Sequence, residues 1–420
     1  MATIIPFKGI RPAKDKVHLV TSRSYDSYNA HTLKDKLKFN PYSFLHIIKP
    51  DFGAVKKLKP NSPEHLARVR AKYEEFIKQE YMVEDEEKCL YIYQQKSYGN
   101  TYTGIMCCAS VDDYFNRVIR VHEQTLGLRE EKLKEYLKVV DLNAEPVCLT
   151  YPDDDQVDEL IGDTQANEPA FDFTTTDGCR HKLWPVYSEA VISSIVERFA
   201  AMNALYIADG HHRSASSALL GKTRRAENPG ASASAGFNFF MSILIPFSQL
   251  RIFEFNRLIK DLNGLSVIEF LARVEQKFEV MKNGKKVYLP QERHKFGMYL
   301  SGHWYELTVK PELLKGESPV ESLDARILSQ HILLPILNIS DLSSRKSNRI
   351  GFVGGLEKDM GDNLVNKVDS GKMKLAFTLF PATVEQIVKV ADAEEVMPPK
   401  STWVEPKFRS GLVVYDLSRI

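Results

Sequence analysis

The sequence predicts a mixed α+β fold, and three observations support this class. Segments with the apolar patterns of strands and of helices are interspersed along the whole chain, without the strict alternation of a doubly wound parallel sheet. The apolar fraction of 43% and the charged fraction of 26% are those of an ordinary globular protein. The length of 420 residues favours two or three domains.

We expect one domain at residues 1–225 and a second at residues 236–420. The segment 224–236 between them is rich in Gly, Ala, Ser and charged residues. It is interpreted either as a mobile lid over a ligand site or as an exposed connector, and its composition favours neither.

The charge balance and the cysteines exclude several classes of protein. A net charge of +1 argues against a general binder of nucleic acids or of anionic membranes. No apolar run approaches the length of a membrane span, and the amino terminus lacks an apolar signal region, so we expect a soluble cytoplasmic protein. The five cysteines show no paired spacing of metal ligands. Cys107 and Cys108 lie in an apolar run, which favours buried, reduced thiols.

The elements of the first half follow from local patterns. Residues 4–12 predict a short strand and a turn, and the apolar run 44–48 predicts a strand. Ser62 and Pro63 are typical of a helix start, and an apolar stripe continues to residue 77. The remaining predicted elements are paired strands at 90–95 and 103–109, a helix from 111, a charged helix face at 130–135 and a strand at 145–151.

After residue 151 the chain carries three consecutive aspartates at 153–155. The alternating ligands of a calcium loop are missing, so we expect a solvated acidic loop. The elements predicted beyond this loop are a hairpin of strands at 171–176 and 181–186, a helix at 189–199, strands at 237–245 and 250–258, a helix at 266–278, strands at 295–301 and 304–309, a helix from 323, strands at 349–355 and 374–380, and a helix at 383–391.

The stretch around which the chain is organised is 204–220. Its apolar residues 205–207 predict a buried strand, and Asp209-Gly210 predicts a turn because glycine adopts backbone angles that other residues avoid. Small and apolar residues at helical spacing follow, and Asp209 or Ser214 can cap this helix.

A strand, a tight turn and a helix in this order suit a phosphate. The first N–H groups of a helix lack intrahelical acceptors and carry partial positive charge, so Gly210 to Ser214 can hold phosphate oxygens. Arg213 can make a two-point contact with them. Asp209 can hold a metal ion or accept a proton, and His211 and His212 can move protons. The alternative is a solvated turn, but four functional side chains in five residues favour a site.

Two further segments carry candidate residues. His122 and Glu123 combine groups suited to general acid–base catalysis, although they also fit a helix end or a polar loop. In the segment 397–407, two prolines precede a phosphate-compatible cradle of one cation and two hydroxyls. The cradle consists of Lys400, Ser401 and Thr402. The alternative for this segment is a rigid surface loop with a tryptophan packed into a groove.

Weaker candidates for substrate binding are Arg11, Glu405 and Lys407, of which the last two can also provide a base or an ion pair. Asn256 and Arg257 can reach a ligand, and a structural role in a turn fits them equally well.

The Asp-Gly-His-His-Arg sequence at 209–213, followed by a helix of small residues, resembles the phosphate-binding signature of the ParB/sulfiredoxin superfamily. That superfamily includes nucleotide-binding partition proteins, sulfiredoxin and free-serine kinases. Nearly the whole chain is similar to the bacterial family of unknown function numbered 1015. The motifs that carry this resemblance lie at residues 6–12, 40–44, 122–125, 209–213, 397–403 and 405–407.

The resemblance implies a ParB/sulfiredoxin-like strand-loop-helix core with a second α+β lobe. It also implies a phosphotransfer enzyme that acts on a small hydroxy-amino acid, serine or phosphoserine, as a kinase or phosphatase in serine metabolism. Mg²⁺ and ATP or ADP are the expected cofactors, and a phosphorylated small molecule or a nucleotide is the expected partner. Two alternatives remain: a non-catalytic nucleotide-binding regulator and, ranked lowest, a metal hydrolase that uses the paired histidines.

Overall fold

The computed structural model describes residues 1–314, 318–340, 348–354 and 360–419. They form two compact units. The first comprises residues 1–121, 125–250 and 406–420, and the second comprises 122–124 and 251–405. Helices and strands are mixed in both units, which confirms the predicted α+β class. Within the described residues, no helix is long and apolar enough to cross a membrane.

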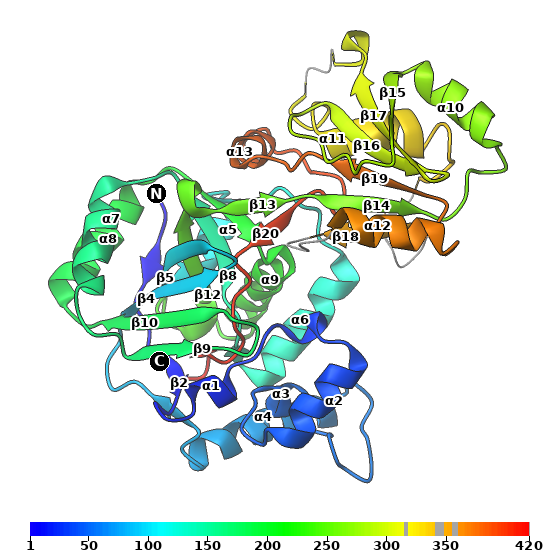
Figure 1. Ribbon diagram of the computed structural model, residues 1–420. Helices are drawn as coiled ribbons and strands as arrows, with labels where there is room; N and C mark the ends of the chain where they lie inside the picture. The colour runs from blue at the N-terminus through cyan, green and yellow to red at the C-terminus, as the bar shows by residue number, and fades with distance from the viewer. Residues whose placement is uncertain (315–317, 341–347, 355–359, 420) are drawn as a thin grey trace. The chain divides into compact units, whose positions relative to one another are not determined.

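The first unit is built on a large sheet with the strand order β6-β11-β8-β12-β5-β4-β10-β9, and β1 also pairs with β5 (Figure 1). The pairs β11–β6 and β12–β8 are parallel, and the other pairs are antiparallel. The strands are β1 (Ile4–Ile5), β4 (Leu90–Ser97), β5 (Asn100–Ser110), β6 (Ile119–Arg120), β8 (Val147–Tyr151), β9 (Phe171–Thr174), β10 (Arg180–Val186), β11 (Leu205–Asp209) and β12 (Phe239–Pro246).

Helices cover this sheet with apolar stripes. The main core joins side chains of the central strands to Val157, Ile161, Ile195 and Phe199 of two helices. The helices next to the sheet are α5 (Val111–Phe115), α7 (Asp155–Gln165), α8 (Glu189–Ala201) and α9 (His211–Glu227), and α6 (Gly127–Val140) packs on α9. All five cysteines are buried free thiols, and they include Cys107 and Cys108, for which the sequence predicts this state.

A smaller core in the same unit joins the amino-terminal helices to short strand pairs. It takes side chains from α1 (Val17–Val20), α3 (Leu45–Ile48), α4 (Pro63–Lys78), the paired strands β2 (Ile10–Pro12) and β3 (Met82–Glu84), and β7 (Leu142–Asn143), which pairs with β21 (Tyr415–Asp416). The helix α2 (Ala30–Phe39) belongs to the same unit. The pairing of β21 with β7 holds the carboxy-terminal segment in the first unit.

The second unit contains a fully antiparallel sheet with the order β15-β17-β16-β19-β14-β18. A separate ladder joins β13 to β20. The elements are β13 (Arg251–Phe253), β14 (Phe255–Ile259), α10 (Val267–Glu275), β15 (Phe278–Gly284), β16 (Lys295–Leu300), β17 (His303–Val309), α11 (Asp324–Leu328), β18 (Ile350–Gly354), α12 (Met360–Asp369), β19 (Leu375–Leu379), α13 (Val384–Asp392) and β20 (Trp403–Glu405).

The structure corrects several predicted elements. Residues 45–48 form the helix α3 rather than a strand, because a short apolar run fits either a buried strand or a helical turn, and here it packs on α4. The acidic run at 153–155 is not a loop throughout. Asp154 caps α7, since its carboxylate accepts hydrogen bonds from the N–H groups of Gln156 and Val157. The segment 224–236 begins as helix, because α9 continues to Glu227.

The two units divide the chain at other positions than the domains expected at 1–225 and 236–420. The strand β12 (Phe239–Pro246) pairs with β5 and β8, so the chain stays in the large sheet until Pro246 and in the first unit until Leu250. Hydrophobic pattern identifies a strand such as β12, but its partners are distant in sequence.

Candidate functional site

The strand β11 and the helix α9 meet at a glycine. The apolar residues Leu205 and Ile207 are fully buried in the sheet core. The register against β8 shifts between Ile207 and Asp209, and Gly210 then adopts the left-handed conformation with φ 103°. The chain turns there into α9. Gly210 itself is the N-cap residue and makes no side-chain cap bond, so the expected cap by Asp209 or Ser214 is wrong.

Gly210 is required for a second reason besides its backbone angle. A Cβ atom at this position would lie 3.0 Å from both Nε and Nη2 of Arg213. The guanidinium therefore occupies the space that a side chain at position 210 would need. The turn and the placement of Arg213 depend on the same glycine.

We expect Gly210→Ala to lower the free energy of unfolding by roughly 1–2 kcal/mol, because an L-residue is strained at positive φ. Displacement of the Arg213 guanidinium adds to this cost. Chemical denaturation would measure it, with Gly178→Ala as the matched control, since Gly178 also has positive φ but open space around it. Equal losses in the two variants would show that Arg213 moves aside without cost.

Asp209 lies between two cations. Lys407 Nζ donates to Asp209 Oδ1 at 3.0 Å, and Arg213 Nη2 donates to Asp209 Oδ2 at 2.8 Å. Arg213 also forms an ion pair with Glu145 at 3.3 Å and donates to the carbonyl oxygen of Pro146 at 2.7 Å. Three segments distant in the sequence are therefore joined in one polar network: the start of α9 and the returning carboxy-terminal segment contact Asp209, and the residues before β8 contact Arg213.

These contacts decide the protonation of the site. Burial raises the pKa of Asp209, but Lys407 and Arg213 outweigh it and lower the pKa to about 2. Burial lowers the pKa of Arg213, but Glu145 and Asp209 outweigh it and raise the pKa. At neutral pH Asp209 is thus an anchored anion and a weak base.

The first turn of α9 holds the other residues of the predicted motif. His211 is 4% exposed, and burial lowers its pKa to about 3 although Asp209 acts in the opposite direction. It is therefore a neutral imidazole at pH 7, which cannot act as a general acid. His212 is half-buried. Ser214 is fully buried, and its hydroxyl donates to the carbonyl oxygen of His211 at 3.0 Å, so a phosphate contact would require that bond to break.

The structure places Arg11 elsewhere in the first unit. Its guanidinium pairs with Asp85, with Nε 2.9 Å from Oδ2, and it lies 5.3 Å from the ring centroid of Phe171. The fork of Arg11 is therefore occupied by a carboxylate of the chain itself. A role in substrate binding stays a prediction.

The other predicted site residues belong to the second unit, apart from Lys407. Lys400 has positive φ, and its Nζ lies 5.1 Å from the ring centroid of Phe255. Ser401 donates to the carbonyl oxygen of Pro398 at 2.6 Å, and Glu405 accepts a hydrogen bond from the indole of Trp403 at 2.8 Å. Thr402 is 9% exposed. These contacts make 398–405 an ordered segment whose phosphate role stays a prediction.

His122 and Glu123 also belong to the second unit. The residue His122 is fully buried, and its carbonyl oxygen accepts a hydrogen bond from Met397 N–H at 2.9 Å. Glu123 is half-buried in the irregular segment that follows β6. The non-helical alternative for this motif is therefore the conformation found, and its catalytic role stays a prediction.

Sequence reasoning did not single out Glu145 and Pro146, which hold Arg213. The available signal was their position immediately before the predicted strand 147–151, which pairs with β11. Because β8 runs antiparallel to β11, a carboxylate just before β8 lies near the residues just after β11. The sequence does not show that these two strands pair.

The same unit contains a second polar cluster, around His181. This fully buried histidine contacts Tyr93 Oη at 2.7 Å through Nδ1. Arg409 Nε donates to His181 Nε2 at 3.3 Å, and Arg409 pairs with Asp177 at 2.7 Å. Burial, with a smaller contribution from Arg409, lowers the pKa of His181 to about 3. A neutral histidine thus anchors the carboxy-terminal segment two residues after Lys407.

Comparison with solved structures finds several similar chains. A free serine kinase mutant in complex with AMP is 13% identical with a TM-score of 0.36, and the match covers 73% of this chain and 88% of that chain. A conserved hypothetical protein from Pyrococcus furiosus is 13% identical with a TM-score of 0.34, over 75% and 96%. SbnI with a carboxy-terminal truncation, from Staphylococcus aureus, is 12% identical with a TM-score of 0.38, over 72% and 84%. At TM-scores below 0.5 these likenesses carry no argument about the site.

No curated protein matches the chain significantly. The family model described as a protein of unknown function, DUF1015, matches residues 4–326. This match covers more than half of the sequence and includes β11, the Gly210 turn and α9. The chain therefore belongs to the DUF1015 family, as its sequence motifs predict.

Proposed function

We propose that this protein is a phosphotransfer enzyme that acts on a small hydroxy-amino acid, serine or phosphoserine, as a kinase or as a phosphatase in serine metabolism. The phosphoryl group binds at the start of α9, beside Arg213 and Lys407. The single observation that carries the proposal is the convergence of these two cations on Asp209 where the helix begins. Phosphoryl transfer depends mainly on positioning and charge compensation, and this arrangement supplies both.

The protonation state of each site residue determines its role in the proposed reaction. Arg213 and Lys407 provide positive charge for the phosphate oxygens, and the backbone of 210–213 adds the partial charge of the helix start. Asp209 and Glu145 hold the two cations in place before the ligand arrives. A neutral His211 can accept a proton but is a weak base, so proton transfer falls to another group. His122, Glu123 and Lys400 stay predictions for this step and for further charge compensation.

Magnesium fits this site as a companion of the nucleotide. Both oxygens of Asp209 already accept hydrogen bonds from cations of the chain, so a resident ion bound to Asp209 would displace Lys407 or Arg213. Mg²⁺ prefers oxygen ligands and is held largely by substrate phosphates in many enzymes of this reaction class. Asp209, the predicted metal ligand, and Glu145 could complete its ligand set only by giving up their contacts with Lys407 or Arg213. The ion would neutralise charge on the phosphates of ATP or ADP.

One observation favours the alternative of a non-catalytic nucleotide-binding regulator. Both carboxylates at the start of α9 are engaged with cations, and the neighbouring His211 has a low pKa. This set of groups binds charge well but includes no strong base. A regulator would use the same site to hold a nucleotide without turnover.

Phosphorus NMR of the purified full chain with magnesium tests the proposal. One tube contains phosphoserine, a second contains phosphoserine with ADP, and a third contains serine with ATP. Release of inorganic phosphate from phosphoserine alone identifies a phosphatase, and phosphoryl exchange with the nucleotide identifies a kinase. Unchanged spectra in all tubes, together with nucleotide binding measured by calorimetry, would replace the enzyme by the regulator.

A further inference from the structure

A buried arginine in the second unit lies on an interior strand of a sheet, next to the edge strand. Arg257 is on β14, which pairs on one side with β18 and on the other with β19. The residue is only 1% exposed. A strand paired on both sides rarely carries a fully buried charged side chain, because removal of a guanidinium from water is costly unless partners replace the lost hydrogen bonds.

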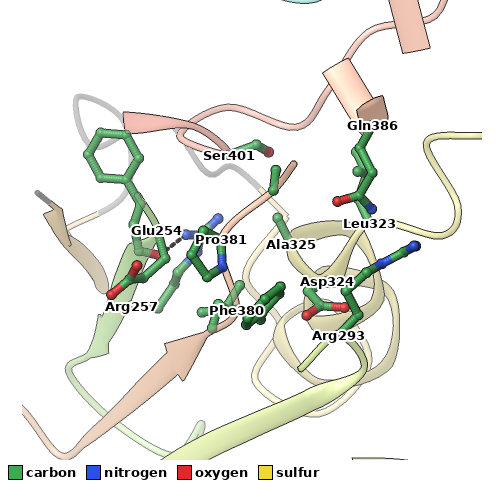
Figure 2. A pocket seen from close by; sticks show the side chains of 13 residues that line it. Glu254, Arg257, Arg293, Leu323, Asp324, Ala325, Phe380, Pro381, Gln386 and Ser401 are labelled. Carbon is green, nitrogen blue, oxygen red and sulfur yellow. Dashed lines mark hydrogen bonds between the residues drawn. The ribbon is translucent and has the colours of Figure 1, made fainter. Parts of the chain in front are cut away.

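The side chain of Arg257 lines a cavity of about 360 Å³, counting the part that is open to solvent. Figure 2 shows Arg257 among the lining residues, with Arg293 and Asp324 on the opposite side of the view. Ser401 and Gln386 complete the polar lining. The enclosed part is small, so the cavity suits the charged end of a small molecule rather than a whole nucleotide.

One edge of the Arg257 guanidinium makes no hydrogen bond to the described residues. Nη1 donates to the carbonyl oxygen of Phe255 on the same strand, and the guanidinium carbon lies 5.3 Å from the ring centroid of Phe352. Nε and Nη2 have no hydrogen-bond partner among the described residues. Burial lowers the pKa of Arg257 to about 9, which is the cost expected of a desolvated cation without a carboxylate beside it.

The unused pair of nitrogens has a specific geometry. Nε and Nη2 form one side of the fork, which presents two parallel N–H groups to two oxygens of a carboxylate or a phosphate. Elsewhere in this chain the same edge is filled by an aspartate. Arg180 contacts both oxygens of Asp172, with Nε at 2.8 Å and Nη2 at 2.6 Å. Arg349 uses the same two nitrogens on Asp261.

The acidic residues of the lining do not fill that edge. Burial raises the pKa of Asp324 to about 7, and both of its oxygens accept the backbone N–H of His294. Burial also raises the pKa of Glu254. Both carboxyl groups are therefore biased towards their neutral forms. With Arg257 and Arg293 charged, the cavity carries a positive balance.

We propose that the Nε–Nη2 edge of Arg257 binds the carboxylate or phosphate group of a small molecule in this cavity. All residues of this site belong to the second unit, and the proposal does not depend on the proposed phosphotransfer reaction. Two oxygens of the anion take the place that aspartate oxygens occupy on Arg180 and Arg349. Arg293, which also lines the cavity, supplies a second positive charge.

NMR of the full chain with arginine-selective ¹⁵N labelling allows a direct test, because the Nε–H signal of each arginine is sensitive to an anion bound at its Nε–Nη2 edge. Arg257→Lys identifies the Arg257 signal by its loss. Inorganic phosphate and acetate are titrated in separate arms, with sodium chloride at equal ionic strength as the reference. We expect the Arg257 signal to shift saturably, whereas the signal of Arg180 stays in place. The arm that saturates at the lower concentration distinguishes phosphate from carboxylate chemistry.

Two variants separate this site from the others. In Arg213→Ala the shift of the Arg257 signal should persist, because the start of α9 is not involved. In Arg257→Met the rise in melting temperature on addition of the anion should be lost, while the ligand-free protein melts no lower than the wild type. An Arg257 signal that does not move with either anion, or an Arg257→Met protein that unfolds without ligand, would overturn the proposal in favour of a purely structural arginine.

Discussion

Arg213→Ala is expected to lower phosphoryl transfer at least about 100-fold, the loss typical of removing one group that stabilises transition-state charge. The reason lies in the contacts of Arg213 with Asp209, Glu145 and the carbonyl of Pro146. Without the guanidinium, Lys407 alone remains on Asp209, and Glu145 loses its cation. The phosphorus NMR assay measures the rate, and a thermal melt measures the fold.

Two comparisons make this result specific. Arg213→Lys keeps the charge but loses the fork, so its rate should lie between the wild type and Arg213→Ala. Arg225→Ala is the matched control, because Arg225 lies on the same helix and pairs with an aspartate, Asp112. It should keep the wild-type rate. Normal turnover by a folded Arg213→Ala protein would remove Arg213 from the mechanism.

Acid is expected to destabilise the first unit through His181. The pKa of His181 is about 3 in the folded chain and near 6.5 in the unfolded chain. Between these two pH values the unfolded chain therefore binds a proton at His181 that the folded chain does not bind. The stability contributed by the neutral imidazole is complete above pH 6.5 and falls as the pH drops towards 3. Between pH 7 and pH 4.5 the loss from this one group is about 2–3 kcal/mol.

Denaturant unfolding at several pH values measures this contribution. His181→Gln keeps a polar side chain but cannot titrate, so its stability should decline less over the same pH interval. His31→Gln serves as the control because the side chain of His31 is 89% exposed. Parallel pH curves for wild type and His181→Gln would contradict the buried, neutral state of His181.

The local structure could be predicted where a short sequence specifies its own conformation. Ser62 and Pro63 start α4 as expected, because a cap and a proline act within one turn. Asp209 and Gly210 end a strand and precede a helix for the same reason. The strand predicted at 44–48 is wrong because tertiary packing decides between helix and strand in so short a segment. The cap at Asp154 was missed because three aspartates in a row conceal which of them is the cap.

The partners of the site residues could be predicted less well. The sequence indicates that Lys407 can form an ion pair, but its partner Asp209 lies 198 residues away. Glu145 reaches Arg213 only because β8 pairs with β11. Such contacts depend on the order of the strands, which hydrophobic pattern does not encode. The sequence therefore indicates that Lys407 can pair with an acidic residue, but it does not show that this residue is Asp209.

The return of the chain to its first unit at residue 406 has a consequence for biosynthesis. The ribosome makes residues 251–405 after all strands of the large sheet and before Lys407. At about 5–20 residues per second, this interval lasts roughly ten to thirty seconds. During that time the nascent chain displays Asp209 without its lysine, and His181 without Arg409. The complete set of contacts around Asp209 and His181 is therefore acquired late, only after residues 406–420 have been made.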